Sequence, residues 1–309
     1  NGLENINGLF ESIDVLTDNQ DPDWVYWQEG VYKSKGGGVD QLKLSLQASK
    51  VDISEILRDR LYNKNSNIIL TSATMKVDDS FDYFLNRNGL IESDNIITKD
   101  YISPFSYNDQ VDYYQYGGTK DISGDPLKLS EIIYHVHKTF QKRTMVLFTS
   151  IKMLENVSNM IKEKRDGKDI PLYAQSRGAS KPSIIKGMHD NKNALLFGTN
   201  SFWEGVDLPG ELLEILIVVK LPFDVPSDPL IKSYANYLDV NGVNSFMNYS
   251  VLECAVRFRQ GFGRLIRTTY DSGIFISLDN RLVTKRYGDV ISNSIPIDPI
   301  IFSDYNTIR

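Results

Sequence analysis

Short apolar segments alternate with amphipathic ones from residue 127 onward, and this alternation limits the possible folds more than any other feature of the chain. Strands are predicted at residues 144–149, 171–174, 194–198, 214–220 and 273–278. Helices are predicted around residues 129–140, 153–161, 183–189, 229–238 and 246–267. Strands separated by such helices pair in parallel, and helices on both faces allow the strands to be apolar throughout. The sequence therefore predicts an α/β fold built on a doubly wound parallel sheet.

The chain before residue 127 is organised differently. Aromatic and branched residues at 23–33 and 39–47 surround Gly36 to Gly38, which predicts a hairpin with a glycine-rich tip. A phosphate-binding loop would need Lys followed by Ser or Thr after the last glycine, whereas Val39 and Asp40 follow here. The other elements predicted in this part are a helix at 53–62, a strand at 67–70 and a linker between two lobes at 113–125.

Gln260, Arg264 and Arg267 recur at helical spacing near the C-terminus. Offsets of 0, 4 and 7 residues would place them within about 40° of one line along a helix. The other side would carry the stripe that docks on a core, formed by Phe258, Phe262, Leu265 and Ile266. Two guanidinium groups at fixed separation suit a triphosphate, because each planar fork grips phosphate oxygens in two places and keeps its charge. The alternative is an ordinary solvated basic face.

Small hydroxyl-bearing residues follow two predicted strands, at the positions where ligands bind in doubly wound sheets. The first set is Thr71, Ser72, Ala73 and Thr74. The second set is Thr149 and Ser150, at the start of a helix whose free amides suit a phosphate group. Ser150 is also explained as a simple helix cap.

A polar loop with two glycines follows the predicted strand at 194–198. Its candidate site residues are Ser201, Phe202, Trp203, Glu204, Gly205 and Asp207. Asp207 could accept a hydrogen bond from a ribose hydroxyl, and the backbone of Gly205 could approach it closely. Ser201, Phe202 and Trp203 could hold a nucleic-acid backbone or stack on a base. The alternative is that the two aromatic side chains pack against a neighbouring helix.

Composition argues against several classes of protein. The net charge of −6, from 34 basic and 40 acidic residues, provides no global positive field for nucleic acid, so a nucleic-acid groove must be local. With one cysteine and three histidines, neither an internal disulfide nor a metal site is expected. No apolar run is long enough to span a bilayer, and residues 1–20 do not resemble a signal peptide. A soluble, cytoplasmic protein without membrane contact is expected.

These segments together resemble motifs III, IV, V and VI of superfamily 2 helicases, in both order and spacing. Within that superfamily the chain is similar to the DinG branch of the XPD-like DNA helicases. The segments that carry this closer resemblance are Leu221-Pro222-Phe223, Pro226-Ser227-Asp228-Pro229, Arg259 to Arg267, Leu278-Asp279-Asn280-Arg281 and Lys285-Arg286-Tyr287-Gly288. The resemblance extends from about Asp52 to Pro296.

The resemblance implies a RecA-like fold in two lobes. Residues 1–50 would be the tail of an arch-type insertion, residues 51–112 the C-terminal part of the first lobe, and residues 113–309 the complete second lobe. Arg264 and Arg267 would face the γ-phosphate of ATP, with Gln260 beside them. The nucleotide would also be contacted by Glu204, Gly205, Asp207 and Gly263. DNA would be contacted by Thr149, Ser150, Ser201, Phe202 and Trp203, and the segment from Thr71 to Thr74 would couple the lobes.

Two family elements are not found among the 309 residues: the Gly-x-x-x-x-Gly-Lys-Ser/Thr loop and the acidic box, which hold the phosphates and Mg²⁺. Together with the first residue, Asn1, this suggests a piece of a longer polypeptide that does not hydrolyse ATP alone. The resemblance implies that the full-length protein is an ATP-dependent DNA helicase that uses ATP and Mg²⁺ on single-stranded or forked DNA. Its polarity would resemble the 5′ to 3′ direction of the family. An iron–sulfur cluster and an exonuclease domain, which some relatives carry, stay open.

Two other functions are compatible with the sequence. The same fold could be a nucleotide-sensing regulatory lobe of a nuclease-fused, helicase-like protein that unwinds nothing. An RNA helicase is less favoured, because Gln260-Gly261-Phe262-Gly263 replaces the His-Arg-x-Gly opening that looks typical of the DEAD-box group.

Overall fold

The structure, a computed structural model, describes residues 21, 23–33, 41–65, 67–91, 95–164, 169–175, 181–199, 202 and 212–309. The chain forms two compact units. The first comprises Asn1–Thr71, Phe81–Ile97 and Asp224–Tyr249, and the second comprises Ser72–Ser80, Thr98–Phe223 and Ser250–Arg309. The predicted domain limits at residues 50 and 112 stay predictions.

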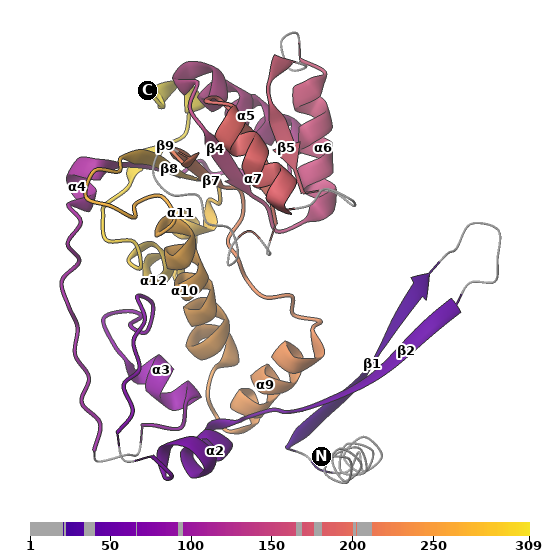
Figure 1. Ribbon diagram of the computed structural model, residues 1–309, viewed down its shortest axis with the longest axis vertical. Helices are drawn as coiled ribbons and strands as arrows, with labels where there is room; N and C mark the ends of the chain where they lie inside the picture. The colour runs from indigo at the N-terminus through magenta and orange to yellow at the C-terminus, as the bar shows by residue number, and fades with distance from the viewer. Residues whose placement is uncertain are drawn as a thin grey trace. The chain divides into compact units, whose positions relative to one another are not determined.

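The second unit is built on a seven-stranded sheet in which every pairing between its described strands is parallel (Figure 1). The strand order is β5-β6-β4-β7-β8-β3-β9. The strands are β3 (Val111–Tyr116), β4 (Thr144–Leu147), β5 (Leu172–Ala174), β6 (Leu195–Gly198), β7 (Ile215–Val218), β8 (Gly273–Ser277) and β9 (Ile300–Phe302). The predicted doubly wound parallel sheet is confirmed.

Helices α5 (Pro126–Phe140) and α6 (Ile151–Lys162) cover one face of this sheet. Both present apolar residues every three to four positions, so each buries one stripe. The helical side of this core comprises Leu129, Ile132, Ile133, Val136, Leu154, Val157 and Ile161. The strand side comprises Val146, Phe148, Leu195, Phe197, Ile215, Ile217, Ile274 and Ile276. Alternate residues of the strands point to the opposite face.

Helix α10 (Val251–Phe262) packs on that opposite face, where Phe275 of β8 points. The rings of Phe258 and Phe262 each lie 5.4 Å from the ring of Phe275, between centroids. Tyr113 of β3 adds a further ring contact with Phe275 at 5.0 Å. The unit also contains α4 (Tyr107–Gln110), α7 (Lys181–Asp190), α11 (Arg281–Thr284), α12 (Gly288–Ser292) and η5 (Tyr305–Thr307).

The first unit contains the predicted hairpin, which is confirmed as an antiparallel pair of β1 (Trp24–Lys33) and β2 (Gln41–Lys50). Its helical elements are α2 (Ser54–Leu57), η1 (Arg58–Tyr62), α3 (Asp82–Arg87), α9 (Pro229–Val240) and most of η4 (Phe246–Ser250). The guanidinium carbon of Arg87 lies 4.1 Å from the ring centroid of Tyr234 and 5.4 Å from that of Tyr249. This cation–π contact holds α3 and α9 together.

Three predictions about individual elements were wrong. Residues 67–70 form no strand and are exposed. The segment proposed as a linker at 113–125 begins inside β3, whose tyrosines fill the sheet instead of connecting lobes. The helix predicted to reach residue 267 ends at Phe262. Strands β3 and β9 were missed because aromatic and polar residues in β3, and the shortness of β9, hide their apolar pattern.

No helix in the described ranges combines the length and apolar character needed to cross a membrane.

Candidate functional site

The candidate site residues divide between the two edges of the parallel sheet. Thr149 and Ser150 follow β4, so they lie at the carboxyl edge. Arg264 and Arg267 come after α10 and before β8, so they lie at the opposite, amino edge. The two arginines therefore lie at the other edge of the sheet from Thr149 and Ser150.

The arginine segment is a tight turn rather than a helix. The amide of Gly263 still bonds to the carbonyl of Arg259 at 2.9 Å, but the amide of Arg264 bonds to the carbonyl of Gly261 at 3.1 Å, which tightens the chain into a turn. Glycine is a poor helix former, so Gly261 and Gly263 weaken the last turn of α10. Arg264 and Arg267 therefore do not share a helical face with Gln260, and that part of the prediction was wrong.

Burial of the residues between the arginines fixes the turn. Leu265 is 1% exposed and Ile266 is 2% exposed, as the predicted core-facing stripe requires. The side chains of Arg264 and Arg267 are half-buried on the same stretch. The arginines thus belong to a segment that is anchored in the core at two successive positions, and Nε of Arg267 is itself buried.

Gln260 contacts the segment that the sequence analysis assigned to coupling. Its Nε2 donates a hydrogen bond to Oγ1 of Thr74 at 3.5 Å, although 186 residues separate the two. Thr74 is half-buried, and its amide donates to Oγ of Ser72 at 3.2 Å. Thr71, Ser72 and Ala73 are exposed. The structure therefore brings one candidate coupling residue, Thr74, to the end of α10.

Lys76 anchors the chain just after Thr74. Its Nζ lies 2.8 Å from Oδ2 of Asp100 and 3.1 Å from Oδ1 of Asp79. The hydrogen bond to Asp100 raises the pKa of Lys76, and the same bond lowers the pKa of Asp100. Because both carboxylates are largely open to solvent, these pairs contribute little to stability and mainly fix the path of the chain.

At the carboxyl edge, the hydroxyls after β4 and β6 have local partners. Ser150 caps α6, because its Oγ accepts a hydrogen bond from the amide of Met153 at 3.4 Å. Thr149 beside it is exposed. After β6, the amide and hydroxyl of Thr199 both donate to Oε1 of Gln175, at 2.8 and 2.9 Å. The cap interpretation of Ser150 is confirmed.

The loop after β6 contributes one described candidate. Phe202 is fully buried, and it lies so close to Gly198 that a Cβ added to this glycine would lie 2.7 Å from the Cβ of Phe202. A fully buried ring does not lie open to a base, so the structure argues against base stacking by Phe202. Ser201, Trp203, Glu204, Gly205 and Asp207 lie outside the described residues.

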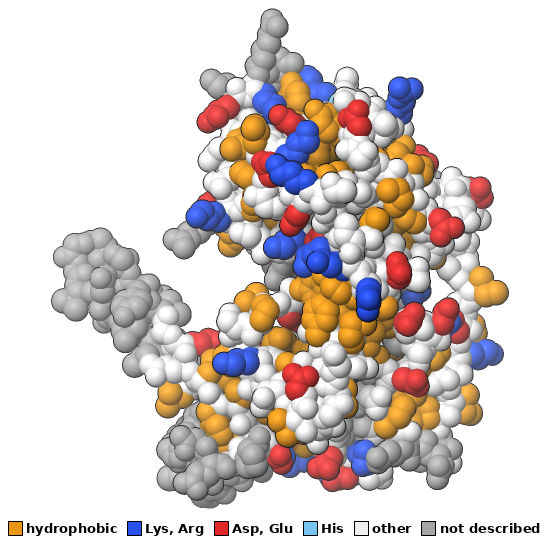
Figure 2. Space-filling model, turned by 180° about the vertical axis from the view of Figure 1, so that it is seen from behind, with side chains coloured by type: hydrophobic (Ala, Val, Ile, Leu, Met, Phe, Trp, Pro, Cys, Tyr) orange, Lys and Arg blue, Asp and Glu red, His pale blue; other side chains and the backbone are white. Residues whose placement is uncertain are grey.

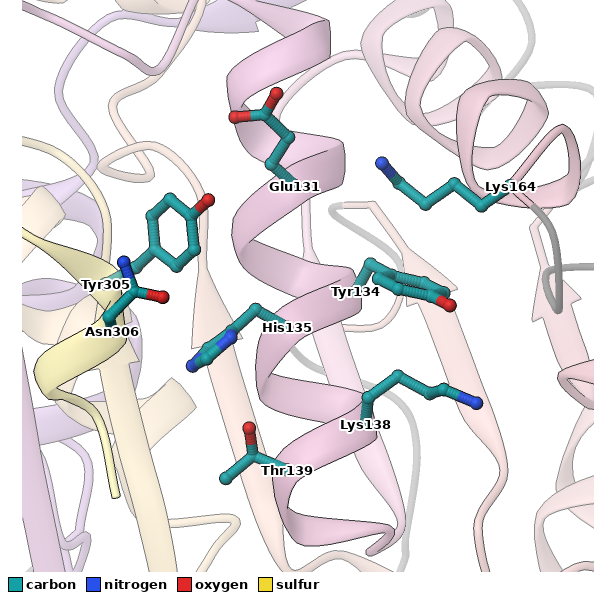
Figure 3. Close-up of a pocket in the computed structure, with 8 residues that line it drawn as sticks. All are labelled: Glu131, Tyr134, His135, Lys138, Thr139, Lys164, Tyr305 and Asn306. Atoms are coloured by element: carbon teal, nitrogen blue, oxygen red, sulfur yellow. The ribbon is translucent and has the colours of Figure 1, made fainter.

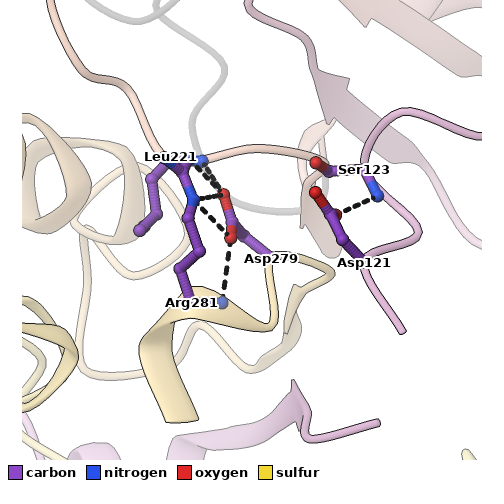
Figure 4. Close-up of polar contacts among 5 residues, drawn as sticks. All are labelled: Asp121, Ser123, Leu221, Asp279 and Arg281. Atoms are coloured by element: carbon purple, nitrogen blue, oxygen red, sulfur yellow. Dashed lines mark hydrogen bonds and ion pairs between the residues drawn. The ribbon is translucent and has the colours of Figure 1, made fainter. Parts of the chain in front are cut away.

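A buried ion pair at the carboxyl edge was not foreseen from the sequence. Asp279 is fully buried after β8, and Arg281 grips it with Nε at 2.9 Å from Oδ1 and Nη2 at 2.6 Å from Oδ2 (Figure 4). The amide of Leu221, after β7, donates to Oδ2 at 2.9 Å. Burial alone would lower the pKa of Arg281, but the bond to Asp279 raises it overall. The Leu-Asp-Asn-Arg string was the available signal.

The same edge holds a second structural carboxylate, Asp121, whose pKa is lowered. Burial by itself would raise the pKa of Asp121, but the hydrogen bond from the amide of Ser123, at 2.8 Å, and the charges of Lys220 and Arg281 lower it overall. Both carboxylates in Figure 4 therefore stabilise loops at the ends of β3, β7 and β8. Asn280 adds to this by donating to the carbonyl of Gly118 at 3.1 Å.

A pocket of about 440 Å³ lies on the outer side of α5. Its lining residues are Glu131, Tyr134, His135, Lys138, Thr139, Lys164, Tyr305 and Asn306 (Figure 3). The rings of His135 and Tyr305 meet at 5.2 Å between centroids. None of the candidate site residues lines this pocket.

The charged side chains on the face seen in Figure 2 are interspersed, with acidic groups beside basic ones. This agrees with the net charge of −6 and with the expectation of a local rather than a global binding surface. Among the described residues, no group of three or more His, Cys, Asp or Glu could hold a metal ion.

A parallel sheet of this order, with α10 leading an arginine turn into its amino edge, defines a RecA-like lobe. Two solved structures support this fold, an XPD helicase and an apo form of XPD, with TM-scores of 0.59 and 0.58. They are 17% and 18% identical to this chain, cover 84% of it, and are themselves covered over 48% and 54% of their length. The predicted RecA-like fold is confirmed.

The sequence matches the family described as the helicase C-terminal domain over residues 133–297. It is 33% identical over 301 residues to the 3'-5' exonuclease DinG of Bacillus subtilis, and 30% identical over 300 residues to the ATP-dependent DNA helicase YoaA of Haemophilus influenzae. Each alignment covers 95% of this chain but only 32% and 44% of those relatives. The chain belongs to the helicase C-terminal domain family, and its similarity to DinG and YoaA over 95% of its own length confirms the resemblance to the DinG branch.

Proposed function

We propose that this chain is the C-terminal portion of an ATP-dependent DNA helicase of DinG type. In this proposal it supplies an arginine-bearing turn to an ATP site whose phosphate-binding loop and Mg²⁺ ligands are not among these 309 residues. The observation that carries the proposal is the hydrogen bond from Gln260 to Thr74, because it joins the proposed coupling segment to the helix that leads into the arginine turn. Without the missing elements, the chain alone is proposed not to hydrolyse ATP.

The proposed chemistry assigns the transition-state charge of phosphoryl transfer to Arg264 and Arg267. A guanidinium that faces the γ-phosphate stabilises developing negative charge without needing proton transfer. The buried anchors at Leu265 and Ile266 support this role, because they hold both arginines on a rigid segment. The hydrogen bond from Gln260 to Thr74 would then couple nucleotide binding at the arginine turn to the segment from Thr71 to Thr74. Gly263 is exposed and lies between Gln260 and Arg264 in the chain, where the absence of a side chain would let the nucleotide approach the backbone.

The proposed nucleic-acid side is the carboxyl edge. Thr149 and Ser150, exposed at the start of α6, would hold a backbone phosphate of single-stranded or forked DNA. Ser201 and Trp203 remain proposed DNA contacts, and Glu204, Gly205 and Asp207 remain proposed nucleotide contacts. Curated relatives named as ATP-dependent DNA helicases support ATP and DNA as the ligands.

The test of this proposal is Arg267→Ala in the full-length protein. DNA-stimulated ATP turnover is expected to fall by about 10³-fold or more, because an arginine finger contributes on the order of 10³ to 10⁵. Arg309→Ala is the matched control, since Arg309 is an exposed arginine of the same unit and is expected to leave turnover unchanged. Turnover in Arg267→Ala close to that of the wild type, with the protein folded, would refute the proposed role.

A second candidate function is a nucleotide-sensing lobe that gates an attached nuclease without unwinding DNA. The name of the Bacillus subtilis relative, an exonuclease, favours considering it. A strand-displacement assay on the full-length protein separates the two functions. ATP-dependent displacement of a labelled strand from forked DNA supports the helicase. Nucleotide-dependent nuclease activity without displacement supports the sensing lobe.

A further inference from the structure

Arg267 lies beyond the turn that ends α10, so the helix does not set its position. The chain at residues 266–267 has no regular secondary structure. What holds its backbone is the carboxylate of Asp271, whose Oδ2 accepts the amide N–H of Arg267 at 2.8 Å. The same oxygen accepts the amide N–H of Thr268 at 2.8 Å, and Oδ1 accepts the Thr268 hydroxyl, also at 2.8 Å.

Gln110 holds the same loop from the end of α4, just before β3. Its Nε2 donates to the carbonyl of Asp271 at 2.7 Å and to the carbonyl of Thr268 at 3.2 Å. Gln110 ends α4 and directly precedes β3, which pairs with β8 from Val111 onward. The amide of Gln110 therefore ties the loop to the amino edge of the sheet on which the arginine turn sits.

Two further features fit a rigid support. A Cβ on Gly273 would lie 2.7 Å from the carbonyl oxygen of Glu214 and 2.6 Å from a methyl carbon of Leu265, so this glycine allows Leu265 to pack closely on the strand. Burial alone would raise the pKa of Asp271, but the hydrogen bonds from Arg267 and Thr268 lower it overall. Asp271 is thus a carboxylate at neutral pH, able to accept all three bonds.

We propose that Asp271, backed by Gln110, is a positioning residue that orients Arg267 toward the reacting phosphate. This inference rests on the proposed function of Arg267. Asp271 acts through the backbone of the arginine: the carboxylate fixes the peptide from which the guanidinium extends. A group that is misplaced by about 1 Å at a reacting centre can cost about 100-fold in rate.

The first experiment compares Asp271→Ala and Asp271→Asn in the full-length protein. The alanine variant is expected to lower kcat for DNA-stimulated ATP hydrolysis by about 100-fold, with KM for ATP within about threefold of the wild type. The asparagine variant keeps one oxygen to accept both amides, so its kcat is expected within about tenfold of the wild type. Wild-type kcat in the alanine variant, or no rescue by asparagine, would overturn the proposal.

The second experiment distinguishes positioning from a general structural role by combining Asp271→Ala with Arg267→Ala. Single-turnover hydrolysis with enzyme in excess detects the low residual rates. If Asp271 acts through Arg267, its loss is expected to change the rate of the Arg267→Ala protein by less than about twofold. A further loss of about 100-fold in that background would mean that Asp271 acts independently, and the proposal would fail.

Asp304→Ala is the matched control. Asp304 makes a comparable turn, accepting the amide N–H of Asn306 at 3.0 Å, but it lies at η5 beyond β9. Its kcat is expected to equal that of the wild type. If Asp271→Ala does not fold, the proposal is tested with Asp271→Asn and Gln110→Ala instead. Gln110→Ala is then expected to lower kcat for ATP hydrolysis at unchanged KM for ATP. Full activity in Arg267→Ala would defeat the proposed function itself, whereas a dead Arg267→Ala beside a normal Asp271→Ala would defeat only this inference.

Discussion

The buried pair of Asp279 and Arg281 allows a quantitative stability prediction for Arg281→Ala. The substitution removes the contacts of Nε and Nη2 with a carboxylate that is fully buried. Removing one partner of a buried pair costs about 3 to 5 kcal/mol, since the other charge stays desolvated. Two backbone donors remain on Asp279, from Leu221 at 2.9 Å and Arg281 at 3.0 Å, so we expect the lower end, about 3 kcal/mol.

Thermal unfolding followed by circular dichroism measures this effect. At about 2 to 4 °C for each kcal/mol in a chain of this size class, Tm is expected to fall by about 6 °C or more. Lys128→Ala is the matched control, because Lys128 and Glu131 form an exposed pair at 3.3 Å that contributes about 0.5 kcal/mol or less.

A second substitution tests the cause. If the cost comes from the stranded charge, Asp279→Asn in the Arg281→Ala background is expected to recover part of the lost stability, because a neutral amide needs less solvation. A destabilisation below about 1 kcal/mol in Arg281→Ala, or a double variant less stable than the single one, would refute this reasoning.

Two other side chains yield predictions. Burial, and then the charge of Lys138, lower the pKa of His137 below its ordinary value of 6.5 in the folded protein. Below about pH 6.5 the unfolded chain therefore binds a proton that the folded protein does not, so the free energy of unfolding decreases as pH falls. His137→Leu is expected to flatten the dependence of the urea midpoint on pH between about 7.5 and 5.5. Arg143 donates from Nε to the carbonyls of Met188 at 2.8 Å and Asn191 at 3.2 Å, so Arg143→Ala is expected to cost about 2 kcal/mol and to speed amide hydrogen exchange at the end of α7. An unchanged pH dependence or unchanged exchange would contradict these two predictions respectively.

Much of the second unit could be predicted because its signals are local. The stripe from Leu129 to Val136 has helical period, and the apolar runs of β4, β6 and β7 are too short for helices. Strand β3 was not predicted because its tyrosines carry polar hydroxyl groups on rings that are buried. The hydroxyl of Tyr113, for example, donates a hydrogen bond to Oε1 of Gln115 at 2.7 Å. Such a strand looks polar in sequence and is buried in the fold.

The candidate site was predictable in its residues but not in its geometry. Gln260, Arg264 and Arg267 were identified from their types and spacing, yet their common helical face was wrong, because the helix ends at Phe262. Helix boundaries depend on which backbone groups find partners, and here the amides of Arg264 and Arg267 bond to Gly261 and Asp271 instead of continuing the helix. Asp271 and Gln110 carry no motif signal of their own, so only the contacts at Thr268 reveal them.

The sequence by itself determined the class of fold, a parallel sheet between helices, and the chemical types of the candidate residues, because periodicity and side-chain chemistry are local properties. Tertiary structure alone decided that Arg264 and Arg267 enter at the amino edge of β8, that Gln260 meets Thr74, and that Phe202 is buried. The physical reason is that each of these depends on strand order and on contacts between distant segments, which are set when the whole core packs and which no short stretch of chain encodes.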